Sequence, residues 1–175
     1  MEKLFLLTKW LTFPGAMVRA FVEQIVCRCI GLPVEDNRIL RNDELFGHVD
    51  HELAPSSRSS FALCFVPAFI NALLALVLLL PSAVGLFFLG MTGWYMIAAN
   101  VAAYWFAFSL FCNSYPLIED ALNMKDKIYH GSNVWLKIIY APGFAFLFVL
   151  SFAEKYCLTF AFALAGLIWL ICSMA

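Results

Sequence analysis

The chain has 175 residues, of which 63% are hydrophobic and only 13% are charged. The apolar excess excludes an ordinary soluble domain, and a formal net charge of −1 gives no basis for binding nucleic acid. Because this length suits one compact unit, we expect a single membrane domain over residues 1–175. Membrane lipids are then its first predicted partners.

The central part of the chain carries no charged side chain between Arg58 and Glu119. This segment is about three times as long as the roughly 20 apolar residues that span a bilayer. The sequence therefore predicts an all-α, polytopic membrane helical bundle with about five transmembrane helices.

The N-terminal apolar stretch, Leu4 to Phe13, is short and ends at Pro14-Gly15. It is a poor signal peptide because Lys9 interrupts it and no small-residue cleavage site follows, so we keep it in the mature protein. Its length leaves open whether it spans the membrane or re-enters it.

A helix is expected over residues 15–31, with Pro14 in its first turn and Gly31 at its end. Arg19 and Glu23 lie four residues apart, and therefore on one face of this helix. Ionisable groups at membrane depth are costly, which makes these two residues functional candidates. The plainer interpretation is a self-neutralising pair that makes the helix tolerable in lipid.

Residues 32–58 form the longest polar segment and could contain a short β-hairpin, with strands at Arg38-Ile-Leu and Phe46-Gly-His-Val around a turn at Arg41-Asn-Asp. The segment is rich in metal-ligand side chains, among which we single out His48, His51 and Glu52 as loop candidates. A metal in this loop is the weaker hypothesis, because short polar loops often carry such groups by chance. The serines at 56–60 predict a cap for the helix that follows.

Further membrane helices are expected over 60–80, 94–112, 136–153 and 157–174, with Pro81 ending the first of them. Residues 113–135 are expected to form a second polar loop. Asn71 and Asn100 are lone amides inside spans, which favours hydrogen bonds between helices. The six cysteines lack a C-x-x-C pair and are interpreted as small buried apolar residues.

Basic residues near the helix ends place the two polar loops on the same side of the membrane. This distribution predicts that both loops and the C-terminus are cytoplasmic. We expect an integral multi-pass protein of a prokaryotic plasma membrane.

Four segments, taken in order, resemble one known family. They are Phe13-Pro-Gly-Ala-Met-Val18, Phe46-Gly-His-Val-Asp-His-Glu52, Val66-Pro-Ala-Phe-Ile-Asn71 and Asn113-Ser-Tyr-Pro-Leu-Ile-Glu-Asp-Ala-Leu-Asn123. Together they are similar to small intramembrane zinc metalloproteases of the site-2-protease type, over roughly residues 10–125. The resemblance implies the fold of that family, with Asp120 at the position of its third metal ligand.

The zinc-binding motif of that family, H-E-x-x-H, is degenerate in this chain. Arg19 and Glu23 stand at the positions of its two histidines, and Ala20 stands at the position of its glutamate. The chemistry requires two imidazoles to hold zinc and a carboxylate to take a proton from zinc-bound water. We therefore expect no catalytic residues, no metal and no cofactor.

With the zinc motif lost, a guanidinium could replace the cation of the family site. We expect Arg19 to bridge Glu23 and Asp120, so that these residues form a buried charge cluster. The predicted function is that of a non-catalytic subunit or scaffold that binds another membrane protein. Two alternatives stay open, a divergent metallo-hydrolase that uses Glu23, Asp120 and the loop histidines, and a small transporter or channel subunit.

Overall fold

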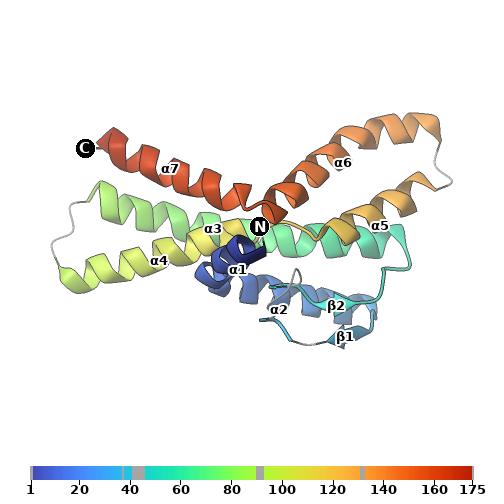
Figure 1. Ribbon diagram of the computed structural model, residues 1–175, viewed down its shortest axis with the longest axis horizontal. Coiled ribbons are helices and arrows are strands. Elements are labelled where there is room, and N and C mark those ends of the chain that lie inside the picture. Colours follow the sequence, from blue (N-terminus) through green and yellow to red (C-terminus); the bar gives the residue numbers. More distant parts are fainter. Residues whose placement is uncertain (1, 37, 41–45, 90–92, 131–132, 175) are drawn as a thin grey trace.

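The computed structural model describes residues 2–36, 38–40, 46–89, 93–130 and 133–174. The protein is mostly helical, and a two-stranded antiparallel sheet follows its second helix (Figure 1). The elements in chain order are α1 (Glu2–Leu11), α2 (Phe13–Ile30), β1 (Val34–Asp36), β2 (Asp50–His51), α3 (Ser57–Phe87), α4 (Trp94–Cys112), α5 (Ile118–Tyr129), α6 (Val134–Lys155) and α7 (Leu158–Met174).

Helix α2 begins and ends where the sequence predicts. Pro14 lies in its first turn, where the missing N–H removes no hydrogen bond. Gly31 ends the helix in the left-handed region with φ of 71°, and the N–H of Leu32 donates to the carbonyl of Cys27 at 2.8 Å. The predicted short apolar stretch before it forms the separate helix α1, and the two helices meet at Thr12.

Helix α3 is longer than expected. Ser56 caps its N-terminus, as predicted, by accepting a hydrogen bond from the N–H of Ser59. The expected end at Pro81 is wrong, because the helix continues through that proline to Phe87. The hydroxyl of Ser82 donates to the carbonyls of Leu78 and Leu79, which gives the disturbed turn polar contacts that water cannot supply in lipid.

Helices α3 and α4 pack along each other, and Figure 1 shows them as a long hairpin that points away from the strands. Within the described residues these are the two helices long and apolar enough to cross a bilayer, and α6 holds a shorter apolar segment. Only 28% of the apolar window of α3 and 22% of that of α4 is buried. Apolar surfaces of this extent are typical of contact with lipid or with another protein, and two such helices agree with membrane association.

The polar segment after α2 forms a hairpin, but the strands lie further apart in sequence than predicted. Val34 pairs with His51 and Asp36 pairs with Asp50, with an irregularity between them. The expected turn around Arg41 lies outside the described residues. The hairpin therefore starts immediately after α2 and brings His51 back beside that helix.

The second polar segment is not a simple loop, because it contains the helix α5. Ala121 and Met124 are buried at a spacing of three, and Ile128 packs against the core four residues later. This spacing is typical of an amphipathic helix, in which one stripe faces the core. Helix α5 packs against α3 and α6, and the side chain of Asn123 donates to the carbonyl of Ala54 at 3.4 Å.

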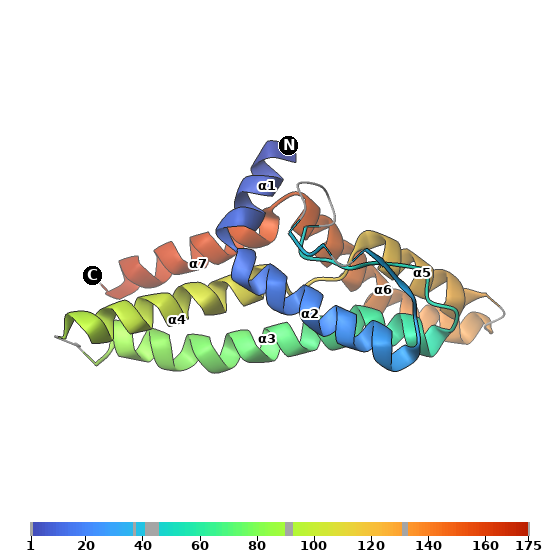
Figure 2. The same ribbon diagram turned by 90° about the horizontal axis from the view of Figure 1, so that it is seen from below.

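Two glycines allow close contacts that hold the parts together. A Cβ on Gly15 would lie 2.1 Å from the carbonyl oxygen of Ser109, so α2 approaches α4 almost backbone to backbone. A Cβ on Gly47 would lie 2.6 Å from the Cβ of Ala16, and Gly47 has φ of 80°. The segment after β1 is thereby pressed against α2, as Figure 2 shows from below.

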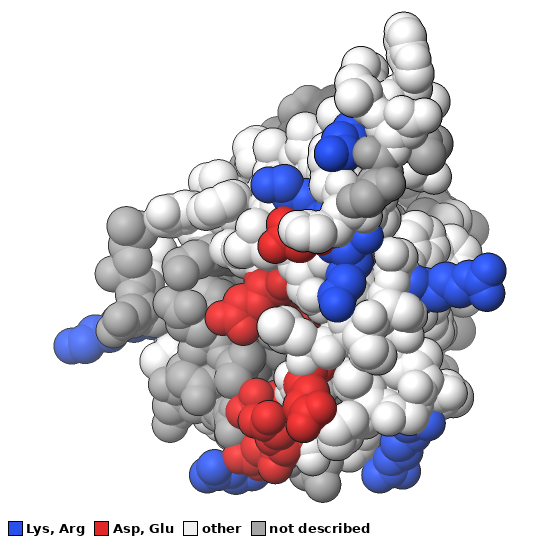
Figure 3. Space-filling view, turned by 90° about the vertical axis from the view of Figure 1, so that its right-hand side faces the viewer, with Lys and Arg blue, Asp and Glu red and all other residues white. Residues whose placement is uncertain are grey.

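The charged side chains gather at the end of the molecule that carries the strands and α5. Figure 3 shows acidic side chains down the middle of this face and basic side chains around them. The two polar segments meet here, since the hydroxyl of Ser57 donates to the carbonyl of Lys127 at 3.3 Å. This contact agrees with the prediction that both segments lie on one side of a membrane, which stays a prediction.

Candidate metal centre

Three acidic or imidazole side chains from separate elements meet inside the protein. Glu23 comes from α2, His51 from β2 and Asp120 from the first turn of α5. One ligand atom of each lies within 4.8 Å of the other two. Glu23 is 0% exposed, Asp120 is 5% exposed, and the side chain of His51 is 4% exposed.

The imidazole of His51 is oriented as a metal ligand would be. Its Nδ1 lies 2.9 Å from the backbone carbonyl of Glu52, which can only accept, so Nδ1 carries the proton. Its Nε2 then faces Oε1 of Glu23 at 3.7 Å and Oδ2 of Asp120 at 3.8 Å. A carbonyl that fixes the tautomer in this way is a regular partner of metal-binding histidines.

The atoms that face one another here have no hydrogen-bond partner. Both carboxylate oxygens of Glu23, Nε2 of His51 and Oδ2 of Asp120 are buried and unsatisfied. Buried polar atoms in folded proteins are nearly always paired, so a cluster of unpaired acceptors indicates that a cation belongs between them.

The pKa values of Asp120 and His51, which lie outside α2, reflect this close approach of charged groups. Burial, and then the negative charge of Glu23, raise the pKa of Asp120 from 3.8 to about 6. Burial lowers the pKa of His51, but the carboxylates of Glu23 and Asp120 outweigh it and raise that pKa to about 9. Without a metal, this centre holds protons more tightly than water-exposed groups do.

The expected salt bridges of Arg19 are not formed. The side chain is 1% exposed, but its Nε donates to Nδ1 of His48 at 3.3 Å, and Nη1 donates to the carbonyl of Asn113 at 3.4 Å. Neither oxygen of Glu23 has a hydrogen-bond partner, so the predicted bridge to Glu23 and Asp120 is wrong. The reason is that His48 lies between them, with Nδ1 3.6 Å from Oε2 of Glu23.

The sequence analysis did not single out Asn113, which connects the helices around the centre. Its side-chain amide donates to the carbonyls of Thr12 and Ser109. Its backbone carbonyl accepts from Arg19 and from Asn71. Asn71 also donates to the carbonyl of Gly15 at 3.2 Å, which confirms an interhelical role for that amide. The signal that could have pointed to Asn113 is its place at the start of the fourth segment quoted for the resemblance, directly after an apolar span.

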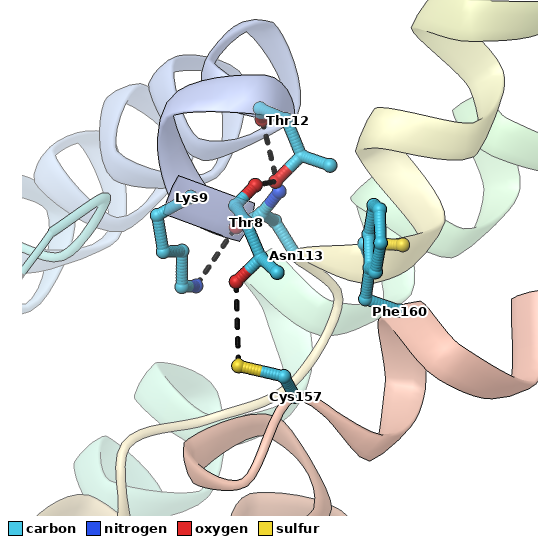
Figure 4. Close-up of a pocket in the computed structure, with 7 residues that line it drawn as sticks. Thr8, Lys9, Thr12, Asn113, Cys157 and Phe160 are labelled. Atoms are coloured by element: carbon cyan, nitrogen blue, oxygen red, sulfur yellow. Dashed lines mark hydrogen bonds between the residues drawn. The ribbon is translucent and has the colours of Figure 1, made fainter. Parts of the chain in front are cut away.

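A small polar hollow lies on the other side of Asn113 (Figure 4). The buried ammonium of Lys9 donates to Oδ1 of Asn113 at 2.8 Å, and the hydroxyl of Thr8 lies 3.3 Å from Sγ of Cys157. The hollow has a volume of about 10 Å³, which is the space of one water molecule. It holds α1 and the turn before α7 against the same asparagine that contacts Arg19.

The remaining candidate residues lie apart from the three ligands or carry no reactive group. Ala20 is fully buried and offers only a methyl group, which can neither bind a metal nor accept a proton. Glu52 contributes its backbone carbonyl to His51, while its side chain is exposed. Asn100 donates to the carbonyl of Met96 within α4. Four of the six cysteines are buried, and Cys29 and Cys172 are exposed.

The spacing of the three ligands suits a divalent transition metal. Zinc with tetrahedral bonds of 2.0–2.2 Å keeps its ligand atoms roughly 3.3–3.6 Å apart. The separations of 3.7 and 3.8 Å around His51 are slightly longer than this value, and all three ligand atoms lie within 4.8 Å of one another. One imidazole and two carboxylates suit zinc, manganese or iron(II).

The chain matches no family model, no curated protein and no solved structure.

Proposed function

We propose that the protein is a non-catalytic, metalloprotease-like membrane protein whose buried centre of Glu23, His51 and Asp120 binds one divalent metal ion. The ion joins the hairpin and α5 to α2, and so fixes the polar end of the molecule. The observation that carries the proposal is the convergence of one ligand atom from each of these three buried side chains within 4.8 Å, with Nε2 of His51, Oδ2 of Asp120 and both oxygens of Glu23 unsatisfied. This replaces our sequence-based expectation that the chain binds no metal.

A proton on His51 is the competing way to neutralise the centre. One N–H can form a good hydrogen bond with one acceptor, but Oε1 of Glu23 and Oδ2 of Asp120 both lie beyond 3.5 Å from Nε2. Both oxygens of Glu23 would still lack a partner. A divalent ion contacts all three side chains at once and offsets both carboxylate charges.

The alanine at position 20, where the resembled family has its glutamate base, supports a structural role for the metal. Hydrolysis on a metal requires a group that takes a proton from the bound water, and Ala20 cannot do so. The second candidate is the divergent metallo-hydrolase of the sequence analysis. The number of ligands favours this hydrolase, because three protein ligands leave one coordination position of the metal open, as in catalytic zinc sites.

The membrane arrangement proposed here has about five spans, formed by α2, α3, α4, α6 and α7. The charged end shown in Figure 3 is placed on the cytoplasmic side of a prokaryotic plasma membrane. Support comes from the apolar side chains that stay exposed on four of these helices, such as Phe69, Val101, Phe146 and Phe162. Lipids and another membrane protein subunit are the proposed partners, and the protein acts as a scaffold for that subunit.

Metal analysis of the protein purified in mild detergent tests the centre. We expect about one divalent metal per chain, lost in Asp120→Asn and in His51→Gln. Glu119→Gln is the matched control, because this neighbouring carboxylate on α5 is exposed and should leave the metal content unchanged. Metal-free wild-type protein that does not take up zinc, manganese or iron(II) would refute the proposal. Hydrolysis of a membrane peptide that is lost with the metal would favour the second candidate.

A further inference from the structure

We infer that the metal centre also binds a small monovalent anion, such as hydroxide or a carboxylate, between the metal and the guanidinium of Arg19. The inference rests on the metal centre proposed above. It assigns Arg19 a role in anion binding in place of the carboxylate bridge that the sequence suggested.

Arg19 has one nitrogen, Nη2, that makes no hydrogen bond. The side chain is 1% exposed, two of its nitrogens donate to His48 and Asn113, and Nη2 is buried without a partner. A guanidinium stays protonated in proteins, so this donor cannot be removed by a change of charge. The fork geometry of the group is suited to an oxygen anion.

Arg19 also lies next to the metal ligands. Nδ1 of His48 accepts from Arg19 at 3.3 Å and lies 3.6 Å from Oε2 of Glu23. Because that nitrogen accepts a hydrogen bond from arginine, it has no proton to donate to the carboxylate. The imidazole therefore separates the guanidinium from Glu23 without neutralising either group.

The charges at the loaded centre do not balance without another ligand. A divalent ion offsets Glu23 and Asp120, and the histidine ligand is neutral when it binds metal. The guanidinium of Arg19 then leaves one net positive charge in a buried place. Since isolated buried charges are strongly disfavoured, a monovalent anion completes the centre.

The surrounding polar atoms indicate a small ligand. Oδ1 of Asn71 is also buried without a partner, and the amide of this residue donates to the same Asn113 carbonyl that accepts from Arg19. Exchanging the positions of Oδ1 and Nδ2 in Asn71 would place Oδ1 against two carbonyl oxygens. The assigned orientation, with Oδ1 as the unpaired acceptor, is therefore correct. A metal-bound hydroxide, which both accepts and donates, satisfies Arg19 and Asn71 together.

Cobalt-substituted protein and added azide test this inference. We expect the visible absorption of bound cobalt to change as azide is added, and neutral urea to cause no change. Arg19→Gln should weaken the azide response about tenfold, the loss expected for one charge-assisted hydrogen bond. Lys9→Gln is the control, because it removes a buried cation on the far side of Asn113.

The outcomes separate this inference from the proposed function. Protein that takes up no cobalt contradicts the metal centre itself. A cobalt spectrum that azide does not alter, or that it alters equally in wild type and Arg19→Gln, overturns the anion site. If Arg19→Gln fails to fold, Arg19→Lys retains the charge, and we expect it to keep a weakened azide response. An Arg19→Lys response as strong as that of wild type would contradict the role of the guanidinium fork.

Discussion

At Glu23 a carboxylate lies inside the protein with neither oxygen hydrogen-bonded. Such a group is stable only with a cation beside it, and the nearest candidates are the proton of His51 and a metal. Sequence reasoning singled out Glu23 as a charge at membrane depth and Asp120 through the resemblance, and it grouped both with the loop histidines in the metallo-hydrolase alternative. It could not show that His51 is the third member of the cluster, because the hairpin that returns His51 to α2 depends on tertiary contacts and not on local sequence.

In the metal-free protein, His51 should make stability depend on pH. Folding raises its pKa from 6.5 to about 9, so the stabilisation by its proton is complete below about pH 6.5 and is lost as pH rises through 9. We expect the Tm of metal-free protein to fall between pH 7 and pH 9.5. Thermal melts in detergent check this, with His51→Gln as the control that lacks the decline. A decline of equal size in that variant would contradict the assignment.

At the scale of elements, the apolar spans were predictable and the polar elements were not. Helices α4 and α7 begin within one residue of their predicted positions, since long apolar runs fix them. Helix α3 continues through Pro81, so a proline inside an apolar run did not fix the helix end, and Ser82 donates to the carbonyls of Leu78 and Leu79 in the same turn. Helix α5 was missed because its charged composition hid an apolar spacing at Ala121, Met124 and Ile128 that could have been found.

The contact of Gly47 with α2 should be required for metal binding. Gly47→Ala places a side chain at φ of 80° and 2.6 Å from the Cβ of Ala16, so the hairpin must move away from the centre. Gly31→Ala is a matched control, with φ of 71° and no atom within 4 Å. Both changes should cost about 1–3 kcal/mol in backbone strain. Only Gly47→Ala should also weaken zinc binding, which isothermal titration measures.

At the scale of the molecule, the structure is polar at one end and apolar along α3 and α4 (Figures 1 and 3). Composition alone predicted this division, because a charge-free segment of this length cannot stay in water. The number of spans depends on the lengths of α2, α6 and α7 in a bilayer, and composition does not fix these. The proposed topology is therefore best tested from outside the cell.

Cysteine labelling of intact cells should show both polar segments on one side. In a background with serine at the exposed Cys29 and Cys172, we expect Ser57→Cys and Lys127→Cys to resist an impermeant probe. Phe88→Cys, at the exposed far end of α3, should react. Labelling of only one of the first two positions would contradict the contact between Ser57 and Lys127.

The three ligands come from segments that are far apart in the chain, and this has a kinetic consequence. A metal held by residues 23, 51 and 120 can leave only after the hairpin or α5 moves away from α2. Its exchange is then governed by a local opening of the protein and not by encounter with a competing ligand. Transfer to an excess of chelator should proceed at a rate that does not depend on the chelator concentration, and the reciprocal of that rate constant is the lifetime of the closed hairpin.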